Sequence, residues 1–122
     1  MQMIKAIIRT TRVDRVVRAL QEVGAPGITV SHVHGVGHGY DAELFTFASS
    51  ELTRNPLLAK IEVVCANDQV NALTGAVLAN ASTGTQGDGV VFVIPVERAV
   101  RVKDGAAPFT SPLTKEKKEI TP

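Results

Sequence analysis

The 122-residue sequence predicts an α+β domain of the ferredoxin-like kind, in which an antiparallel sheet carries two helices on one face. The main observation is an apolar pattern of strand, helix and strand that occurs twice, once in each half of the chain. The length suits one domain, and contents of 44% hydrophobic and 20% charged residues are typical of a globular protein. Aromatic residues make up only 4%, so the core is expected to consist of Val, Ile, Leu and Ala.

The first strand–helix–strand unit lies near the N-terminus. Residues 3–9 form a compact apolar run suited to a strand, and residues 28–33 form a β-branched run suited to a second one. Between them, Thr11 and Asp14 have the spacing of a capping box, and Gly24 stands where a helix C-terminal cap is expected. The helix between these signals has an apolar stripe that consists of Val13, Val16, Val17, Leu20 and Val23.

The second unit repeats this order. Residues 61–65 predict a strand, and Asn67 and Asp68 open a helix. A short loop then leads into the apolar strand 90–94. The stripe of this second helix consists of Val70, Leu73, Val77 and Ala81.

The loop at residues 83–89, Thr-Gly-Thr-Gln-Gly-Asp-Gly, is the strongest functional signal in the sequence. Its glycines relieve Cβ clashes and let backbone N–H groups turn towards an anion. The spacing is neither that of a Walker A loop nor that of a Rossmann glycine motif. Two interpretations remain: a phosphate site, or a Gly/Asp-rich turn between a helix and a strand.

Two helices can cover only one face of the predicted sheet. The strands are too apolar for the other face to be solvated. Since the sequence predicts no further helix, the expected cover is another copy of the chain, arranged in a closed ring.

Composition excludes several classes of function. A net charge of +1 gives no electrostatic reason to expect nucleic acid or an anionic membrane as a partner. The single Cys65 lies in an apolar run, where it is expected to be buried and inert, as in a reducing cytoplasm. The N-terminal apolar stretches are too short for a signal peptide or a membrane span. Without a Gly-x-Ser-x-Gly motif, and with Asp88 explained by turn chemistry, we expect no enzyme.

A long connection, residues 35–58, separates the two units and has the length of a functional loop. Its Leu44, Phe45 and Phe47 are too apolar for a surface loop that makes no contacts, so they either contact a partner or pack on the protein's own strands. The domain is expected to span residues 1–109, with a flexible tail at 110–122.

Three histidines raise the question of a metal. His32 and His34 are expected on one face of a strand, and His38 follows four residues later. Such imidazoles could hold Zn, Ni or Cu, although no Cys or paired carboxylate nearby completes a set. The alternative is that they are polar residues on the exposed side of the strand.

Several separate motifs together resemble the PII signal-transduction proteins. The resemblance covers residues 3–105 and includes the long central loop, the glycine loop and an end motif similar to Val-Glu followed by Arg-Ile-Arg-Thr-Gly. It needs no insertion or deletion. The matching segments are residues 4–9, 19–24, 27–30, 35–37, 60–62, 83–89 and 96–105.

This resemblance implies a homotrimer with an adenine nucleotide (ADP, ATP or AMP) in each cleft between subunits. The loop equivalent to residues 37–55, the T-loop, would contact a regulated target protein through Leu44, Phe45, Phe47 and Glu51. Arg101 would reach a phosphate from the adjacent chain, unless it is an ordinary surface charge. The implied nucleotide-binding residues are Thr29, Gly35, Gly37, Thr83, Gly84, Gly87, Asp88, Gly89, Arg101 and Lys103.

The sequence also departs from the pattern of the family. A phosphate-binding Lys is here Val90, and the Lys that pairs with 2-oxoglutarate is Leu58. The Gln that coordinates magnesium is Gly39, so the role of Mg is left open. The modifiable Tyr is Glu51, and Lys103 stands where Arg is usual. Ordinary 2-oxoglutarate sensing is therefore not expected.

Two function classes follow from the sequence. The first is a nucleotide-binding regulator that controls a transporter, an enzyme or a transcription regulator in nitrogen or related metabolism. The alternative is a trimer associated with metal or bicarbonate transport, with His32, His34 and His38 as metal ligands.

Overall fold

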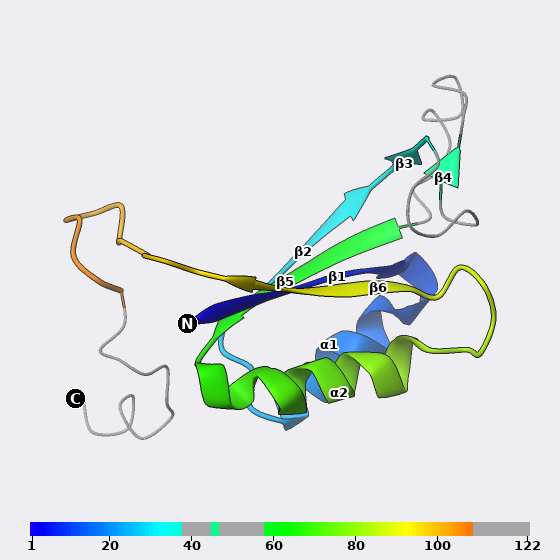
Figure 1. Ribbon diagram of the computed structural model, residues 1–122, viewed down its shortest axis with the longest axis horizontal. Helices are drawn as coiled ribbons and strands as arrows, with labels where there is room; N and C mark the ends of the chain where they lie inside the picture. Colours follow the sequence, from blue (N-terminus) through cyan, green and yellow to red (C-terminus); the bar gives the residue numbers. More distant parts are fainter. Residues whose placement is uncertain (38–44, 47–57, 109–122) are drawn as a thin grey trace.

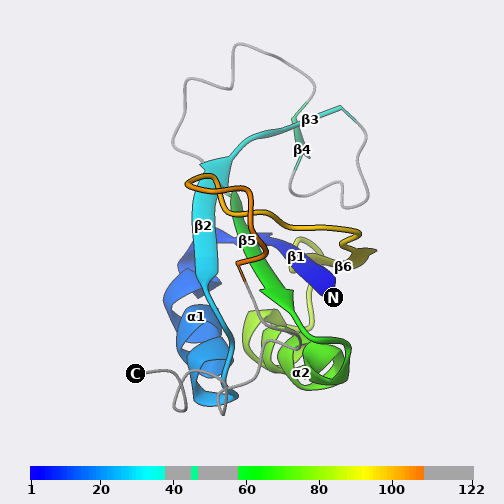
Figure 2. The same ribbon diagram turned by 90° about the vertical axis from the view of Figure 1, so that its left-hand side faces the viewer.

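The computed structural model describes residues 1–37, 45–46 and 58–108, and it contains one four-stranded antiparallel sheet with both helices on the same side (Figures 1 and 2). The spatial order of the strands is β2-β5-β1-β6, which is the predicted ferredoxin-like arrangement. The strands of the sheet and the two helices that cover it are β1 (Gln2–Arg9), α1 (Val13–Glu22), β2 (Ile28–Val33), β5 (Leu58–Cys65), α2 (Val70–Ala81) and β6 (Gly89–Pro95).

The core lies between the helices and one face of the sheet. Strand β1 contributes Ile4, Ala6 and Ile8, which alternate with residues of the opposite face because side chains along a strand have a period of two. The predicted helical stripes meet these residues through Val16 and Leu20 of α1, which are 0% exposed. Strand β5 and α2 supply Ile61, Val63, Cys65, Leu73, Val77 and Ala81.

Cys65 has the predicted environment. Its side chain is fully buried in the core, and desolvation by burial raises the pKa of the thiol above its ordinary value. The residue therefore packs as a small apolar side chain and is not an activated thiolate.

The beginning of α1 corrects one prediction. Thr11 and Asp14 do not form a capping box, because residues Thr10–Arg12 form a 3-10 turn and the α-helix begins only at Val13, with no side-chain cap. The predicted C-terminal cap is confirmed: Gly24 has φ +83°, and its N–H donates to the carbonyl of Gln21 over 3.0 Å. The Ala25 N–H donates to the Leu20 carbonyl over 2.9 Å, which completes a Schellman motif.

Helix α2 is entered through a second 3-10 turn, Asn67–Gln69. Gln69 ties this turn to its surroundings, because its Oε1 accepts the Ala66 N–H over 3.0 Å and its Nε2 donates to the Gly24 carbonyl over 3.5 Å. One side chain thus links the start of α2 to the end of α1. Among the described residues, no helix is long and apolar enough to cross a membrane.

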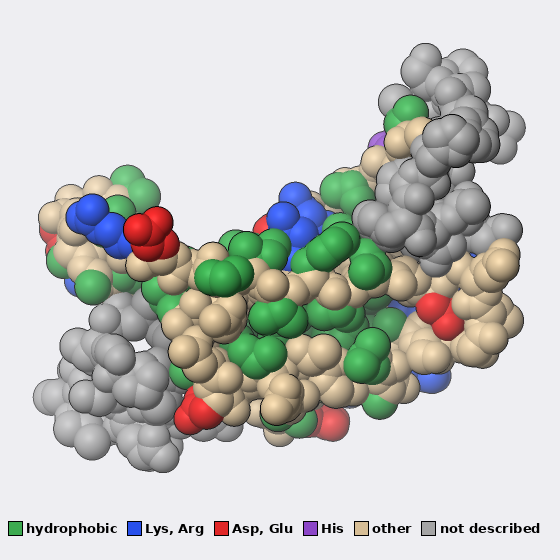
Figure 3. Space-filling view, in the orientation of Figure 1, with side chains coloured by type: hydrophobic (Ala, Val, Ile, Leu, Met, Phe, Trp, Pro, Cys, Tyr) green, Lys and Arg blue, Asp and Glu red, His purple; other side chains and the backbone are tan. Residues whose placement is uncertain are grey.

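The helix-free face of the sheet carries both charged and apolar side chains. Lys5 pairs with Glu62 on β5 and with Phe92 on β6 in the strand register. Glu62 lies 3.8 Å from the ammonium of Lys5 and 4.0 Å from that of Lys60. Around this ion cluster, Phe92 and Ile94 remain 39% and 37% exposed. Figure 3 shows hydrophobic side chains gathered over the sheet beside a group of basic ones.

A small second sheet lies at the end of β2. It consists of β3 (Gly35–Val36) and β4 (Phe45–Thr46), which pair in parallel. The sequence did not predict it, because two residues carry no readable alternation. Most of the predicted T-loop (residues 38–44 and 47–55) and the tail at 110–122 lie outside the described residues.

Candidate functional site

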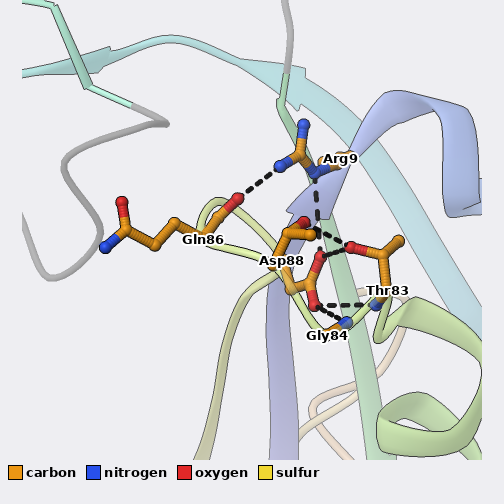
Figure 4. Close-up of polar contacts among 6 residues, drawn as sticks. Arg9, Thr83, Gly84, Gln86 and Asp88 are labelled. Atoms are coloured by element: carbon orange, nitrogen blue, oxygen red, sulfur yellow. Dashed lines mark hydrogen bonds and ion pairs between the residues drawn. The ribbon is translucent and has the colours of Figure 1, made fainter.

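The loop between α2 and β6 is organised around the carboxylate of Asp88 (Figure 4). Asp88 Oδ2 accepts the backbone N–H of Thr83 over 2.7 Å and that of Gly84 over 3.0 Å. Asp88 Oδ1 accepts the hydroxyl of Thr83. These contacts join the two ends of the loop, which therefore closes on its own aspartate.

The same hydrogen bonds control the ionisation of Asp88. The hydroxyl and the backbone N–H of Thr83 are the main causes that hold the pKa of this carboxyl below its ordinary value, followed by the N–H groups of Gly84 and Thr85. At neutral pH the loop thus contains a fixed negative charge. The hydrogen-bond donors of Thr83 and Gly84 are used to bind Asp88. The anion that these two residues hold is therefore the carboxylate of Asp88.

The glycines of the loop have the backbone role that the sequence predicts. Gly84, Gly87 and Gly89 have φ values of +80°, +91° and +111°, a region that other residues seldom adopt. Gly89 is also sterically required, because a Cβ there would lie 2.0 Å from the carbonyl oxygen of Ile7. Strand β6 can therefore pair with β1 immediately after the loop, where Ile8 and Gly89 are register partners.

Arg9 is a neighbour of the loop that the sequence did not single out. It is the last residue of β1, and its Nη2 donates to the carbonyl of Gln86 over 2.5 Å. Its Nε lies 3.8 Å from Asp88 Oδ1, so the guanidinium faces the loop from the sheet (Figure 4). Arg9 and Gln86 are 77 residues apart in sequence, and the pairing of β1 with β6 brings them together. No local sequence motif therefore indicates this contact.

Two departures from the PII pattern are packed together beside Arg9. Leu58 is 2% exposed and forms a small apolar cluster with Ile7, against which Val33 and Val90 pack. Positions 58 and 90, where the resemblance implies lysines, are therefore parts of one apolar cluster on the helix-free face. Neither supplies a cation.

The other predicted nucleotide-binding residues of the first half occupy two places. Gly35 lies in β3, and Gly37 follows it with φ +96°; both lie beyond the end of β2. Thr29 lies further back in β2, where its hydroxyl donates to the carbonyl of Glu62 over 3.4 Å.

Arg101 and Lys103 lie far from the glycine loop of their own chain. The loop precedes β6, whereas residues 96–108 follow it and extend beyond the opposite end of the sheet (Figure 1). Here Arg101 pairs with Asp104 over 3.3 Å, and its backbone closes a tight turn by accepting the N–H of Gly105. One chain alone does not bring these basic residues to the loop.

The predicted metal ligands are only partly described. His32 lies in β2, but the strand ends at Val33, so His34 lies one residue beyond the strand in which the sequence placed it. Both histidines are exposed, and within residues 1–37 and 58–108 no three metal-ligating side chains are grouped. His38 lies outside the described residues, as do Leu44, Phe47 and Glu51. For Phe45 only the backbone, in β4, is described.

Comparison with known proteins decides the family. A family model described as "Nitrogen regulatory protein P-II" matches residues 1–106. The chain belongs to the nitrogen regulatory protein P-II family. The resemblance that the sequence motifs indicate is thereby confirmed, and the sheet and helices agree with it.

Individual P-II proteins support this assignment. The chain is 41% identical over 107 residues to the nitrogen regulatory protein P-II of Bradyrhizobium diazoefficiens and 39% identical over 107 residues to that of Cereibacter sphaeroides. Each match covers 86% of this chain and 94% of the relative. A P-II homolog of Arabidopsis thaliana is 37% identical over 105 residues, which are 84% of this chain but only 53% of the plant protein.

Proposed function

We propose that this P-II protein is a non-enzymatic signal-transduction regulator that binds an adenine nucleotide between the subunits of a homotrimer. The observation that carries the proposal is the separation of the glycine loop from Arg101 at opposite ends of β6 (Figure 1). Two halves of a phosphate site that cannot meet within a chain can meet between chains. The regulated target would then sense the nucleotide through the loop at residues 37–55.

The helix-free face supports the assembly. Phe92 and Ile94 are exposed there in the single chain, next to the Lys5–Glu62 ion pair. Burial of such apolar side chains against a second copy contributes about 25 cal/mol per Å² of area removed from water. If copies of the chain met through these faces, the helix-free face of each sheet would also be buried.

Each half of the proposed site has its own task. The backbone at Gly87, Asp88 and Gly89 would contact phosphate oxygens from one subunit, and Thr83 and Gly84, which donate to Asp88, would hold the loop in the shape that binds them. Arg101 of the neighbouring subunit would add a bidentate charge, and Lys103 a point charge. Thr29, Gly35 and Gly37 would contact the remainder of the nucleotide.

Calorimetric titration with ADP tests the shared site. Arg101→Ala should weaken binding by about 1.5–3 kcal/mol, since a charge-assisted hydrogen bond is lost. A loop variant, Gly87→Val, should weaken binding as well, because φ at Gly87 is +91° and a branched side chain would distort the loop. When the two variants are co-assembled, some clefts combine an intact loop with an intact Arg101 and should regain wild-type affinity. A shared site is refuted if no mixture recovers any high-affinity binding while each variant still assembles.

The apolar surroundings of Leu58 disfavour the binding of a second, anionic ligand. A dicarboxylate such as 2-oxoglutarate would find no cation at this buried position. We therefore expect 2-oxoglutarate added with Mg-ATP to leave the nucleotide affinity unchanged, with a coupling free energy near zero. Cooperative binding would appear as about 1–3 kcal/mol in the same titration and would contradict this expectation.

A further inference from the structure

We infer that Arg9 is the residue through which each chain presents positive charge to a phosphate held at its own glycine loop. This inference rests on the proposed function and adds to it a binding residue from the same subunit as the loop. Its starting point is the position of Arg9 at the end of β1, directly beside Leu58 on β5 and one residue beyond the Ile8–Gly89 pair. Its place at the end of a strand that pairs on both sides fixes its backbone.

The charge of the loop itself favours a basic residue beside it. Between Ser82 and Val90 the only charged side chain is Asp88, which is an anion. A phosphate that approaches the loop therefore meets a like charge. Within the described part of the chain, the basic side chain paired with this carboxylate is Arg9.

The neighbouring positions cannot replace this charge. Val90 and Leu58 belong to the apolar cluster around Ile7 and carry no charge. Arg101 and Lys103 of the same chain lie beyond the far end of β6 (Figure 1). Arg9 is thus placed to supply charge in cis, while Arg101 would supply it from the neighbouring subunit.

The contacts of Arg9 leave it able to turn to a ligand. Its distance of 3.8 Å from Asp88 Oδ1 is longer than a hydrogen bond, and Asp88 already accepts three hydrogen bonds from Thr83 and Gly84. The carboxylate therefore keeps its partners if the guanidinium moves. The hydrogen bond from Arg9 Nη2 to the Gln86 carbonyl uses one of the five N–H donors of the group. The side chain is 38% exposed, so a ligand can reach it.

A matched set of variants tests the inference by calorimetric titration with ADP and with adenosine, which lacks phosphate. Arg9→Met keeps the unbranched stem and removes the charge. It should weaken ADP binding about tenfold or more and leave adenosine binding unchanged, because only the phosphate contact is lost. Arg18→Met removes the same charge from the exposed side of α1 and should bind both ligands as the wild type does.

Two results would overturn the inference while the proposed function survives. The first is an ADP affinity of Arg9→Met equal to that of the wild type. The second is an equal loss for ADP and adenosine, which would make Arg9 a support of the loop's fold only. If Arg9→Met does not fold, Arg9→Lys is titrated instead, and a selective loss for ADP of a few-fold is required. Wild-type protein that binds neither ligand would overturn the proposed function itself.

Discussion

Asp88 closes the glycine loop, because its carboxylate accepts the N–H groups of Thr83 and Gly84. The sequence predicts a loop of this kind from its glycine spacing, and it explains Asp88 by turn chemistry. It gives no indication of Arg9, whose contact with Gln86 spans 77 residues and depends on the pairing of β1 with β6. Local motifs therefore predicted the loop, and only the fold revealed its charged neighbour.

Gly89 allows a prediction on stability. Gly89→Ala should destabilise the protein by at least about 2 kcal/mol, because the new Cβ meets the Ile7 carbonyl at 2.0 Å in addition to the strain of φ +111°. Gly84→Ala is the matched control, since φ is +80° but the space around a Cβ is open. It should cost about 1–2 kcal/mol. Urea denaturation at one protein concentration measures both, and equal losses would refute the steric argument.

Asp88 allows a prediction on pH. Its pKa is lower in the folded protein than the ordinary 3.8, so its stabilising contribution is present above that value and is lost as the pH falls towards the folded pKa. The wild type should lose more stability than Asp88→Asn between about pH 5 and pH 2. Urea midpoints across this range test it, with Glu97→Gln, an exposed carboxylate removed elsewhere, as the control. Parallel curves for wild type and Asp88→Asn would contradict a lowered pKa.

At the scale of the elements, both helices and the four long strands were predictable because their apolar periodicity extends over many residues. The residues at which these elements begin and end were harder to predict. The Thr11–Asp14 spacing suggested a cap, but the 3-10 turn at Thr10–Arg12 delays α1 to Val13. The cap at Gly24 was predicted correctly because a Schellman turn requires a positive φ, which glycine adopts at little cost. The pairing of β3 with β4 depends on tertiary contacts and left no local signal.

Helix α2 offers a test of its outer surface. Gly75 lies in the middle of the helix, is exposed, and has no neighbouring atom within 4 Å of the point where a Cβ would stand. Gly75→Ala should stabilise the protein by about 0.5–1 kcal/mol, because alanine loses less backbone entropy in a helix. Ala72→Gly, also exposed on α2, should cause a loss of similar size. Urea denaturation measures both variants, and a destabilised Gly75→Ala would mean that another chain packs on this side of α2.

At the scale of the whole molecule, the two faces of the sheet differ in what covers them. Both helices pack on one face, whereas the other presents Phe92 and Ile94 around the cluster of Lys5, Lys60 and Glu62. Exposed aromatic and aliphatic side chains such as these are enriched in the buried centre of protein interfaces, whereas charged groups are found mainly at the rim. The sequence predicted this uncovered face from the number of helices alone. Which charges lie on it could be assigned only once the strand register was known.

The oligomeric state can be tested with one substitution on each side of the molecule. Phe92→Lys places a second ammonium opposite Lys5 and removes the burial of an aromatic ring, a loss of about 1.5–3 kcal/mol in each copy. Light scattering should give the mass of a trimer for the wild type and a lower mass for Phe92→Lys. Leu78→Lys makes the same kind of change on the outer side of α2, where Leu78 is 58% exposed, and should remain trimeric. If Phe92→Lys keeps the wild-type mass, the subunits do not meet through the helix-free face, and a nucleotide site shared between them would need a different arrangement.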